Sequence, residues 1–143
     1  MTKFIDNGDC TITLPALGLM FSQATITEVD VTQHQAEDLC RELRLAGHDD
    51  WRLPTDHELL ALVDRSRHSP AIDTSFFPDT KSDWYWTSTV CAWGSSHAWR
   101  VSFSLGGGCS SGSRGSYYAL VRAVRSLTQA EIDALAAAKG DKP

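Results

Sequence analysis

The stretch AEDLCRELRLAGHDDWRLPTDHELLALVD, residues 36–64, decides the fold of this chain. Just before it, Thr32 and Gln35 have the spacing of a capping box, in which each side chain satisfies a backbone donor of the other residue. Apolar residues then recur at helical spacing, and Gly47 is placed to end a helix in the left-handed conformation. The stripe consists of Ala36, Leu39, Cys40, Leu43 and Ala46. The pattern predicts an amphipathic helix that opens at Thr32 and ends at Gly47.

The DWRLPT motif, residues 50–55, predicts a rigid connector that leads into a second helix. Its proline disfavours helix in the preceding residue, and Thr55 with Glu58 forms another capping box. We expect Trp51 to fill the core and Arg52 to form a salt bridge or to bond backbone carbonyls. The second helix is predicted to continue through Leu59, Leu60, Leu62 and Val63. We interpret the motif as scaffold.

The flanking segments have the patterns of strands and loops. Residues 4–21 are predicted to form a short hairpin. Residues 66–81 are predicted to form an irregular loop pinned to the core by Ile72, Phe76 and Phe77. From Trp84 onward, WYWTSTV, AWRVSF and YALVRAVR indicate a sheet, with a glycine-rich interruption before the last of them.

Alternation within AWRVSF, residues 98–103, predicts one buried and one exposed face. The face predicted to be buried carries Trp99, Val101 and Phe103. The face predicted to be exposed carries Ala98, Arg100, Ser102 and Ser104. Alternation also assigns Trp84 and Trp86 to the core, and we expect Arg122 and Arg125 to be structural ion-pair partners.

The C-terminal segment predicts a short helix after the domain proper. Thr128 and Glu131 form a third capping box, and Leu127 and Ile132 are spaced as a hydrophobic staple. The expected organisation is therefore one domain over residues 1–126, followed by a helix and tail over residues 127–143. One domain also fits a length of 143 residues.

Composition excludes several classes of protein. The net charge of −5, with both signs mixed along the chain, offers no basic stripe for nucleic acid. No apolar stretch suits a signal peptide or a membrane span, which predicts cytoplasmic synthesis without membrane insertion. The five histidines and the scattered acids lack metal-ligand spacing, so we expect no metal and no cofactor. Cys10, Cys40, Cys91 and Cys109 contain no CxxC pair, and we expect thiols, although Cys91 and Cys109 could meet across neighbouring strands.

The order of motifs resembles the Lcl C-terminal domain family, found at the C-terminus of the Legionella collagen-like adhesin and in bacterial and phage proteins. The resemblance runs from FIDNGDCTIT and GLMF through the helix pair and PAIDTSFFP to YWTST, AWRVSF and LVRAVR. It implies an α+β, C-type-lectin-like fold in which two helices pack on a twisted antiparallel sheet with long irregular loops. The Glu-Pro-Asn and Trp-Asn-Asp triplets of calcium-dependent lectins are missing, which argues against calcium-dependent sugar binding.

Some proteins with this fold are variable products of diversity-generating retroelements, which randomise adenines near the C-terminus. Treated AAC and AAT codons never yield Trp, Met, Lys, Glu or Gln, and SLGGGCSSGSRGSYY, residues 104–118, contains none of these five. Short Gly/Ser loops avoid the same residues by composition, so the pattern fits diversification without proving it.

The resulting prediction is a receptor-type or adhesin-type binding module for a protein or glycan, not an enzyme. Tyr, Ser and Gly are the residues that antibody paratopes use for contact and adaptability. The candidate contacts are one strand face and the Ser/Gly/Tyr-rich loop, with an adjacent loop at residues 95–97. They are Ser95, Ser96, His97, Arg100, Ser102, Ser104, Ser110, Ser111, Ser113, Arg114, Ser116, Tyr117 and Tyr118.

Two alternatives stay open at this point. Formylglycine-generating oxidases share a related fold and use a cysteine pair, for which Cys91 and Cys109 are the candidates. A structural or assembly domain of a phage or surface protein, with a homo-oligomer contact through the C-terminal helix, is the other. Display on a virion or cell surface would require a route other than a signal peptide.

Overall fold

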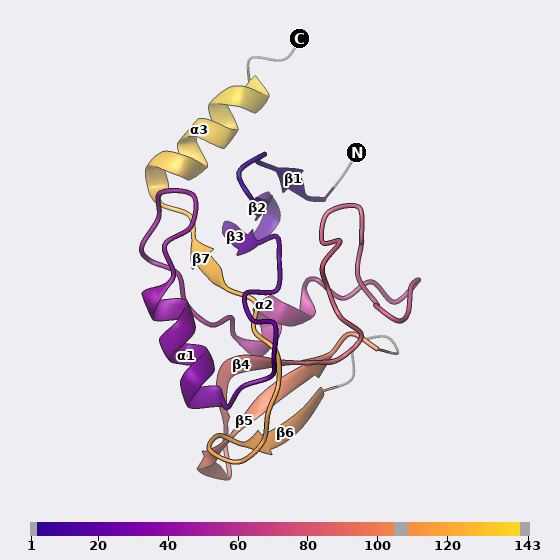
Figure 1. Ribbon diagram of the computed structural model, residues 1–143. Helices are drawn as coiled ribbons and strands as arrows, with labels where there is room; N and C mark the ends of the chain where they lie inside the picture. The colour runs from indigo at the N-terminus through magenta and orange to yellow at the C-terminus, as the bar shows by residue number, and fades with distance from the viewer. Residues whose placement is uncertain (1–2, 105–108, 141–143) are drawn as a thin grey trace.

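Two antiparallel sheets organise the chain, which a computed structural model describes over residues 3–104 and 109–140 (Figure 1). In these residues the first sheet has the order β1 (Ile5–Asp6), β2 (Thr11–Leu14), β3 (Leu19–Ser22) and β7 (Val124–Ser126). The second has the order β4 (Trp84–Cys91), β5 (Gly94–Ser102) and β6 (Cys109–Ser113). With the helices α1 (Gln33–Glu42), α2 (Asp56–Leu60) and α3 (Gln129–Gly140), they confirm the α+β class. The C-type-lectin-like assignment stays a prediction.

The first sheet joins the beginning of the chain to its end. The predicted hairpin is the β2–β3 pair, connected by a 3-10 turn over Pro15–Leu17, and β1 adds a further strand through a turn at Gly8. β7 then pairs antiparallel with β3, placing Met20 opposite Arg125. The closing strand thereby fixes the C-terminal segment against the N-terminal meander.

Helix α1 begins where the sequence predicts and ends earlier. The capping box between Thr32 and Gln35 is present in both directions, which confirms the start. The helix stops at Glu42, however, so the predicted end at Gly47 is wrong. Leu45 and His48 instead close a turn through Gly47, which has a φ of +80°, and the Leu45 carbonyl accepts from the Trp51 indole at 3.2 Å. This hydrogen bond from the buried Trp51 holds Leu45 in a turn, where the apolar spacing alone would continue the helix.

The connector and helix α2 confirm the scaffold interpretation of DWRLPT. Trp51 is buried, and Arg52 donates to both oxygens of Glu58 at 2.7 and 2.8 Å. Glu58 also accepts from the Thr55 amide, completing the second capping box. One carboxylate therefore caps the helix and holds the arginine. The helix ends at Leu60, before the predicted Val63.

The core consists of two clusters that lie on opposite faces of the second sheet. One contains Tyr85 and Val101 with Leu59 of α2, and the other contains Trp86 and Ala98 with Cys40 of α1. Because successive strand residues point to opposite faces, α1 and α2 cover different sides of β4 and β5. The loop at residues 66–81 packs Ile72 and Phe77 into the first cluster, as predicted.

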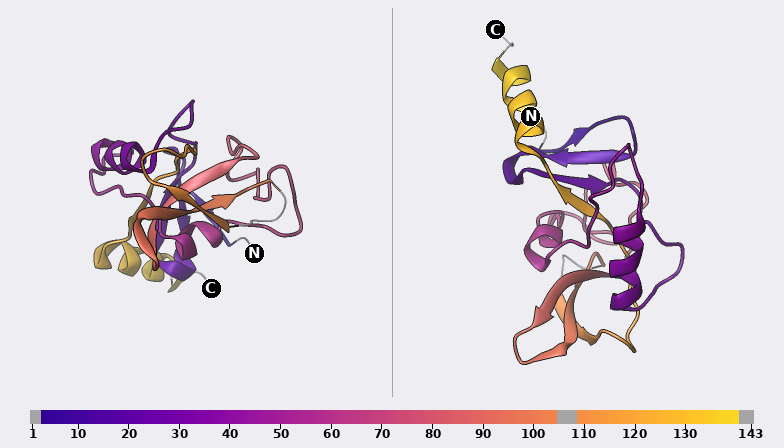
Figure 2. Two further views of the ribbon diagram at one scale, coloured as in Figure 1. Left: turned by 90° about the horizontal axis from the view of Figure 1, so that it is seen from below. Right: turned by 90° about the vertical axis from the view of Figure 1, so that its left-hand side faces the viewer.

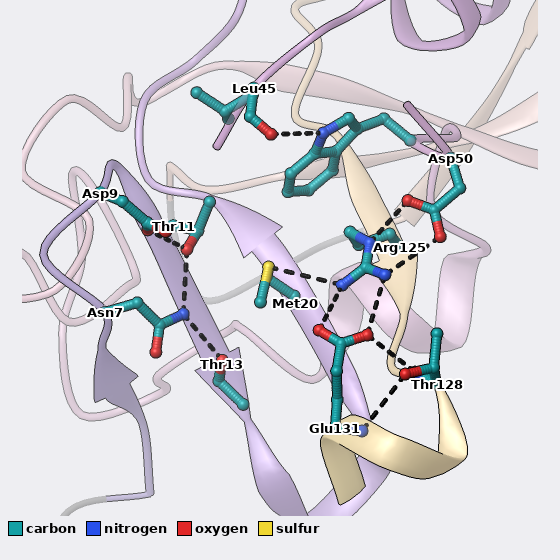
Figure 3. A network of polar contacts seen from close by, with 11 residues as sticks. Asn7, Asp9, Thr11, Thr13, Met20, Leu45, Asp50, Arg125, Thr128 and Glu131 are labelled. Atoms are coloured by element: carbon teal, nitrogen blue, oxygen red, sulfur yellow. Dashed lines mark hydrogen bonds and ion pairs between the residues drawn. The ribbon is translucent and has the colours of Figure 1, made fainter. Parts of the chain in front are cut away.

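Arg125 of β7 confirms the expected ion pairing and anchors α3 (Figure 3). Its side chain is 3% exposed and bonds both oxygens of Asp50 and both oxygens of Glu131 at 2.6–3.1 Å. The two carboxylates raise the pKa of Arg125, and Arg125 holds the pKa of Glu131 down at about 2. Glu131 also bonds Thr128, so the third predicted capping box is present.

For Arg122 the prediction of an ion pair is wrong. It is fully buried and donates to the carbonyl oxygens of Ser22 and Gln23 and to the hydroxyl of Thr80 at 2.6–2.7 Å. No carboxylate of the described residues lies within ion-pair distance of it. Carbonyl dipoles replace the expected counter-ion because its guanidinium lies among backbone turns, and burial lowers its pKa.

The two sheets lie at different ends of the molecule. Helix α3 lies at the end formed by the first sheet, which contains β1, whereas β4, β5 and β6 form the other end (Figures 1 and 2). None of the helices in residues 3–104 and 109–140 is long and apolar enough to span a membrane.

Candidate functional site

The predicted contacts gather on the second sheet and on the turn that follows β6. Ser95, Ser96 and His97 belong to β5, so their assignment to a loop is wrong. Residues 109–113, predicted as part of a glycine-rich loop, form the strand β6, which pairs with β5 from Val101↔Cys109 to His97↔Ser113. The sequence of this strand, CSSGS, lacks the alternating apolar residues that normally identify a strand, so the pattern did not predict it. Leu105 to Gly108 lie outside the described residues.

Both faces of β5 carry buried residues, which corrects the predicted division. Ala98, predicted to be exposed, is fully buried against the α1 cluster, while Trp99, predicted to be core, is half-buried. Trp99 stands opposite Ser111 in the register, so no apolar neighbour on β6 covers it. Phe103, Val101 and Trp86 are buried as expected.

Arg100 lies half-buried in a cage of aromatic rings. Its guanidinium carbon is 4.8 Å from the centroid of Trp84, 5.8 Å from that of Trp86 and 5.2 Å from that of Tyr117. These are cation–π distances. Desolvation lowers the pKa of Arg100, and its buried Nε has no hydrogen-bond partner in the described residues. Trp84 is half-buried, where the sequence predicted a core residue.

Gly112 lets this cage close over the sheet. A Cβ at this position would lie 2.9 Å from Nε of Arg100 and 3.2 Å from Cβ of Tyr117. A contact of 2.9 Å is shorter than real Cβ atoms make, so a side chain here would shift Arg100 and crowd Tyr117. Glycine is needed for the close approach of the two side chains.

The serines of the predicted surface differ in their orientation. Ser102 and Ser110 share the face of Arg100, because Ser110 is its partner on β6 and Ser102 is two residues along β5. Ser111 and Ser113 share the opposite face with Trp99 and His97. All four serines, and Ser104 beyond the strand, are half-buried.

Arg114 is committed to the scaffold. It donates to Gln33 at 2.8 Å, to Glu37 at 3.1 Å and to the Ser95 carbonyl at 3.1 Å. These bonds join the turn after β6 to α1 and to the start of β5. We therefore assign Arg114 to positioning of the surface.

The most exposed part of the surface is the end of the sheet at this turn. Tyr117 is 50% exposed and Tyr118 is 55% exposed, while Ser116 donates to Ser113 at 2.8 Å. On the β4–β5 connection Trp93 is 66% exposed and packs edge-on against Trp99 at 5.6 Å. Sequence reasoning missed Trp93 as a contact, although a tryptophan directly before Gly94 in a hairpin turn is a signal that could have found it.

Cys91 and Cys109 do not form the pair that the sequence left open. Cys91 is opposite Gly94 at one end of β5, whereas Cys109 is opposite Val101 at the other. β5 lies between β4 and β6, so the two backbones are about two strand spacings, or about 10 Å, apart, and the Cys91 thiol is hydrogen-bonded to Ser111. Cys91 is a free thiol whose pKa is raised by burial, and burial raises the pKa of Cys40 to about 12. These raised pKa values keep the Cys91 and Cys40 thiols protonated at neutral pH, so neither of these two is suited to act as a thiolate nucleophile.

Metal binding finds no support in the described part of the chain. No group of three or more His, Cys, Asp or Glu residues there is placed to hold an ion. Asp9 bonds Thr11, and Asp50 bonds Arg125, so two of the acids considered from the sequence serve the fold (Figure 3).

Comparison with known families matches residues 11–125 to the model described as the Lcl C-terminal domain. No curated protein matches the chain. No solved structure matches it either. The matched range contains both sheets except β1 and the last residue of β7, and it ends before α3.

Proposed function

The chain belongs to the Lcl C-terminal domain family, and from this premise we propose that it is a ligand-binding module and not an enzyme. Membership suggests a module of a surface or secreted protein. The proposed binding surface is the free end of the β4–β5–β6 sheet with the turn at residues 114–118.

One observation carries the proposal: Trp93, Tyr117 and Tyr118 are at least half exposed at the same end of one sheet. The hydrogen bonds of Arg114 to the backbone of Ser95 and Ser96 hold the turn beside the start of β5. Large aromatic side chains are costly to leave in water, and Trp, Tyr and Arg dominate the binding energy of protein interfaces. Serines between them supply adaptable polar contacts.

Selection from a displayed random-peptide library and binding to a glycan array would test the proposal. We expect specific binders whose affinity falls about tenfold or more in Trp93→Ala and Tyr118→Ala. Val29→Ala is a matched control, because Val29 is 68% exposed and lies outside the proposed surface. Binders unaffected by both aromatic variants, or no binders at all, would overturn it.

We further propose that the exposed positions of residues 91–118 are diversified by a retroelement and displayed on a virion or cell surface. The residues that hold the surface together, Gly112, Arg114 and Trp99, would have to be spared. A near-copy of the DNA encoding Cys91 to Arg125, differing at adenines beside a reverse transcriptase gene, is the expected finding. A neighbourhood without both features contradicts diversification and leaves the binding module intact.

The oxidase alternative is weakened by the separation of Cys91 and Cys109. An enzyme of that kind needs two thiols that meet, whereas β5 lies between the two strands that carry these cysteines. Mutation of both cysteines to Ser should leave ligand binding unchanged.

An assembly contact through α3 is a second candidate function. Ile132 is 40% exposed, and with Leu135 and Leu127 it lines an apolar hollow beside Ile5. Analytical ultracentrifugation of the full chain should then show a dimer or higher oligomer that Ile132→Asp dissociates. A monomeric wild-type chain at high concentration would contradict this function.

A further inference from the structure

Arg100 differs in its partners from the other buried or half-buried arginines of the described residues. Arg52, Arg114 and Arg125 each have a carboxylate partner, and Arg122 has two carbonyls and a hydroxyl. Arg100 makes cation–π contacts alone, and no described residue accepts a hydrogen bond from it. Its two terminal nitrogens are not among the buried unpaired atoms, so they reach solvent.

The cage surrounds the guanidinium without neutralising it. The ring centroids of Trp84 and Tyr117 lie 4.8 and 5.2 Å from its guanidinium carbon, and both rings are uncharged. Asp83 exerts an electrostatic attraction on Arg100 but lies beyond ion-pair distance, and its carboxylate accepts from the Trp84 amide. A half-buried positive charge without an anionic partner has an unfavourable desolvation energy that an incoming anion would offset.

Two serine hydroxyls lie on the same face: that of Ser102 accepts from the Ser104 amide at 3.1 Å, and that of Ser110 donates to the Ser111 carbonyl at 3.3 Å. Ser110 is the register partner of Arg100, and directly opposed residues have Cβ atoms about 5 Å apart. Ser102 lies two residues along the same strand, next to Trp84 across the β4–β5 pair. The face therefore combines a guanidinium, two hydroxyl groups and flanking rings.

We infer that Arg100 is the anchor for a carboxylate group of the ligand, supplied by an Asp or Glu side chain of a polypeptide partner. The inference rests on the proposed function and names the chemistry of the same surface. The two terminal nitrogens of the guanidinium carry donors without an acceptor among the described residues, and a planar carboxylate can accept two parallel hydrogen bonds from them. The exposed Tyr117, whose ring flanks Arg100, and its neighbour Tyr118 favour a polypeptide because such residues are the usual anchors of protein interfaces.

NMR titration of the full chain with a tetraglutamate peptide tests the inference, with the indole N–H of Trp84 and Nε–H of Arg100 as reporters. We expect saturable shifts at both groups. The matched tetraglutamine peptide should bind at least about tenfold more weakly. Arg100→Gln should abolish the Trp84 shift, and Arg100→Lys, which keeps the charge but loses the planar fork, should weaken binding.

Arg65→Gln is the matched control, because Arg65 is an exposed arginine in the loop after α2 and its loss changes the net charge equally. It should leave the titration unchanged. Near-UV circular dichroism establishes that each variant keeps its fold, and Arg100→Lys serves if Arg100→Gln does not fold.

Three results would overturn the inference: equal binding of tetraglutamine, undiminished binding in Arg100→Gln, or tighter binding of glucuronate or inorganic phosphate than of tetraglutamate. The peptide selection separates it from the proposed function. Selected binders that lack acidic residues and tolerate Arg100→Gln would sink the carboxylate anchor while the binding module stands. Absence of any binder would sink both.

Discussion

Arg125 is buried and Arg100 is half-buried, yet different groups surround their positive charges. Arg125, between the first sheet and α3, has two carboxylates that use its donors inside the molecule. Arg100, in the second sheet, has three aromatic rings and keeps its terminal donors unused among the described residues. The first arrangement can only hold the chain together. The second can hold something else, and this contrast separates scaffold from candidate surface.

Replacing each arginine by methionine gives the largest expected difference. Arg125→Met removes four charge-assisted hydrogen bonds to Asp50 and Glu131, both partly exposed, and should lower the free energy of unfolding by about 2 kcal/mol. Arg100→Met removes only cation–π contacts and relieves an unpaired charge, so its cost should be at most about 1 kcal/mol. Urea unfolding followed by far-UV circular dichroism measures both. Equal costs would mean that Arg100 is also a structural residue.

Gly112→Ala should disturb the aromatic cage, because Gly112 lies on β6, which pairs with the strand of Arg100. The new methyl group would lie 2.9 Å from Nε of Arg100, so we expect a loss of about 1–2 kcal/mol in unfolding free energy and displaced Trp84 and Tyr117 resonances. Gly115→Ala is the control, because no atom lies within 4 Å of a Cβ there. A cage that accepts Gly112→Ala without either change would have to be looser than the structure shows.

Thr55→Ala acts on the scaffold alone. It removes the hydroxyl that caps α2 and loosens the Glu58 carboxylate that holds Arg52, at an expected cost of about 1 kcal/mol. Urea unfolding should show this loss, while the Trp84 reporter of the candidate surface stays unchanged. The exposed Thr74 provides the comparison, since Thr74→Ala should be close to neutral. Movement of the Trp84 resonance would show that the two regions are coupled.

The smallest expected effect is the pH dependence of the Arg125–Glu131 ion pair. Arg125 holds the pKa of Glu131 at about 2, below its ordinary 4.5, so the ion pair stabilises the fold fully above pH 4.5 and is lost as the pH falls toward 2. Glu131 is partly exposed, which limits the gain to about 1 kcal/mol or less. The Tm difference between wild type and Glu131→Gln should therefore shrink from pH 6 to pH 2.5. A difference that is constant across this range would contradict the assignment.

Local signals in the sequence predicted the scaffold well. The three capping boxes are correct because both partners lie three residues apart and need no distant contact. The end of α1 was wrong because the Trp51 indole binds the Leu45 carbonyl, which periodicity cannot show. Arg122 was assigned an ion pair because the carbonyls that bind it lie about 100 positions away in the chain.

The candidate surface was predicted by composition and misplaced in detail. Ser95, Ser96 and His97 extend β5 because β6 pairs with them, and a Ser/Gly strand has no apolar period to reveal it. Trp99 was predicted to be buried because alternation identifies the two faces of a strand. It does not show where along the strand a face is left uncovered, and Trp99 is half-buried. The aromatic cage of Arg100 depends on Gly112 and Tyr117 from two other segments, so only the fold brings it together.

The arrangement of the two sheets has a practical consequence for protein engineering. The first and last described segments of the chain lie beside the first sheet, at the far end from β5 and β6 (Figure 1). A carrier polypeptide fused at either end would leave the serine and tyrosine surface unobstructed. The domain can therefore present grafted residues at Ser116 and Tyr118 of the turn at residues 114–118, while Arg114 is kept to hold the turn and Arg125 with Glu131 and Asp50 holds α3 at the attachment side.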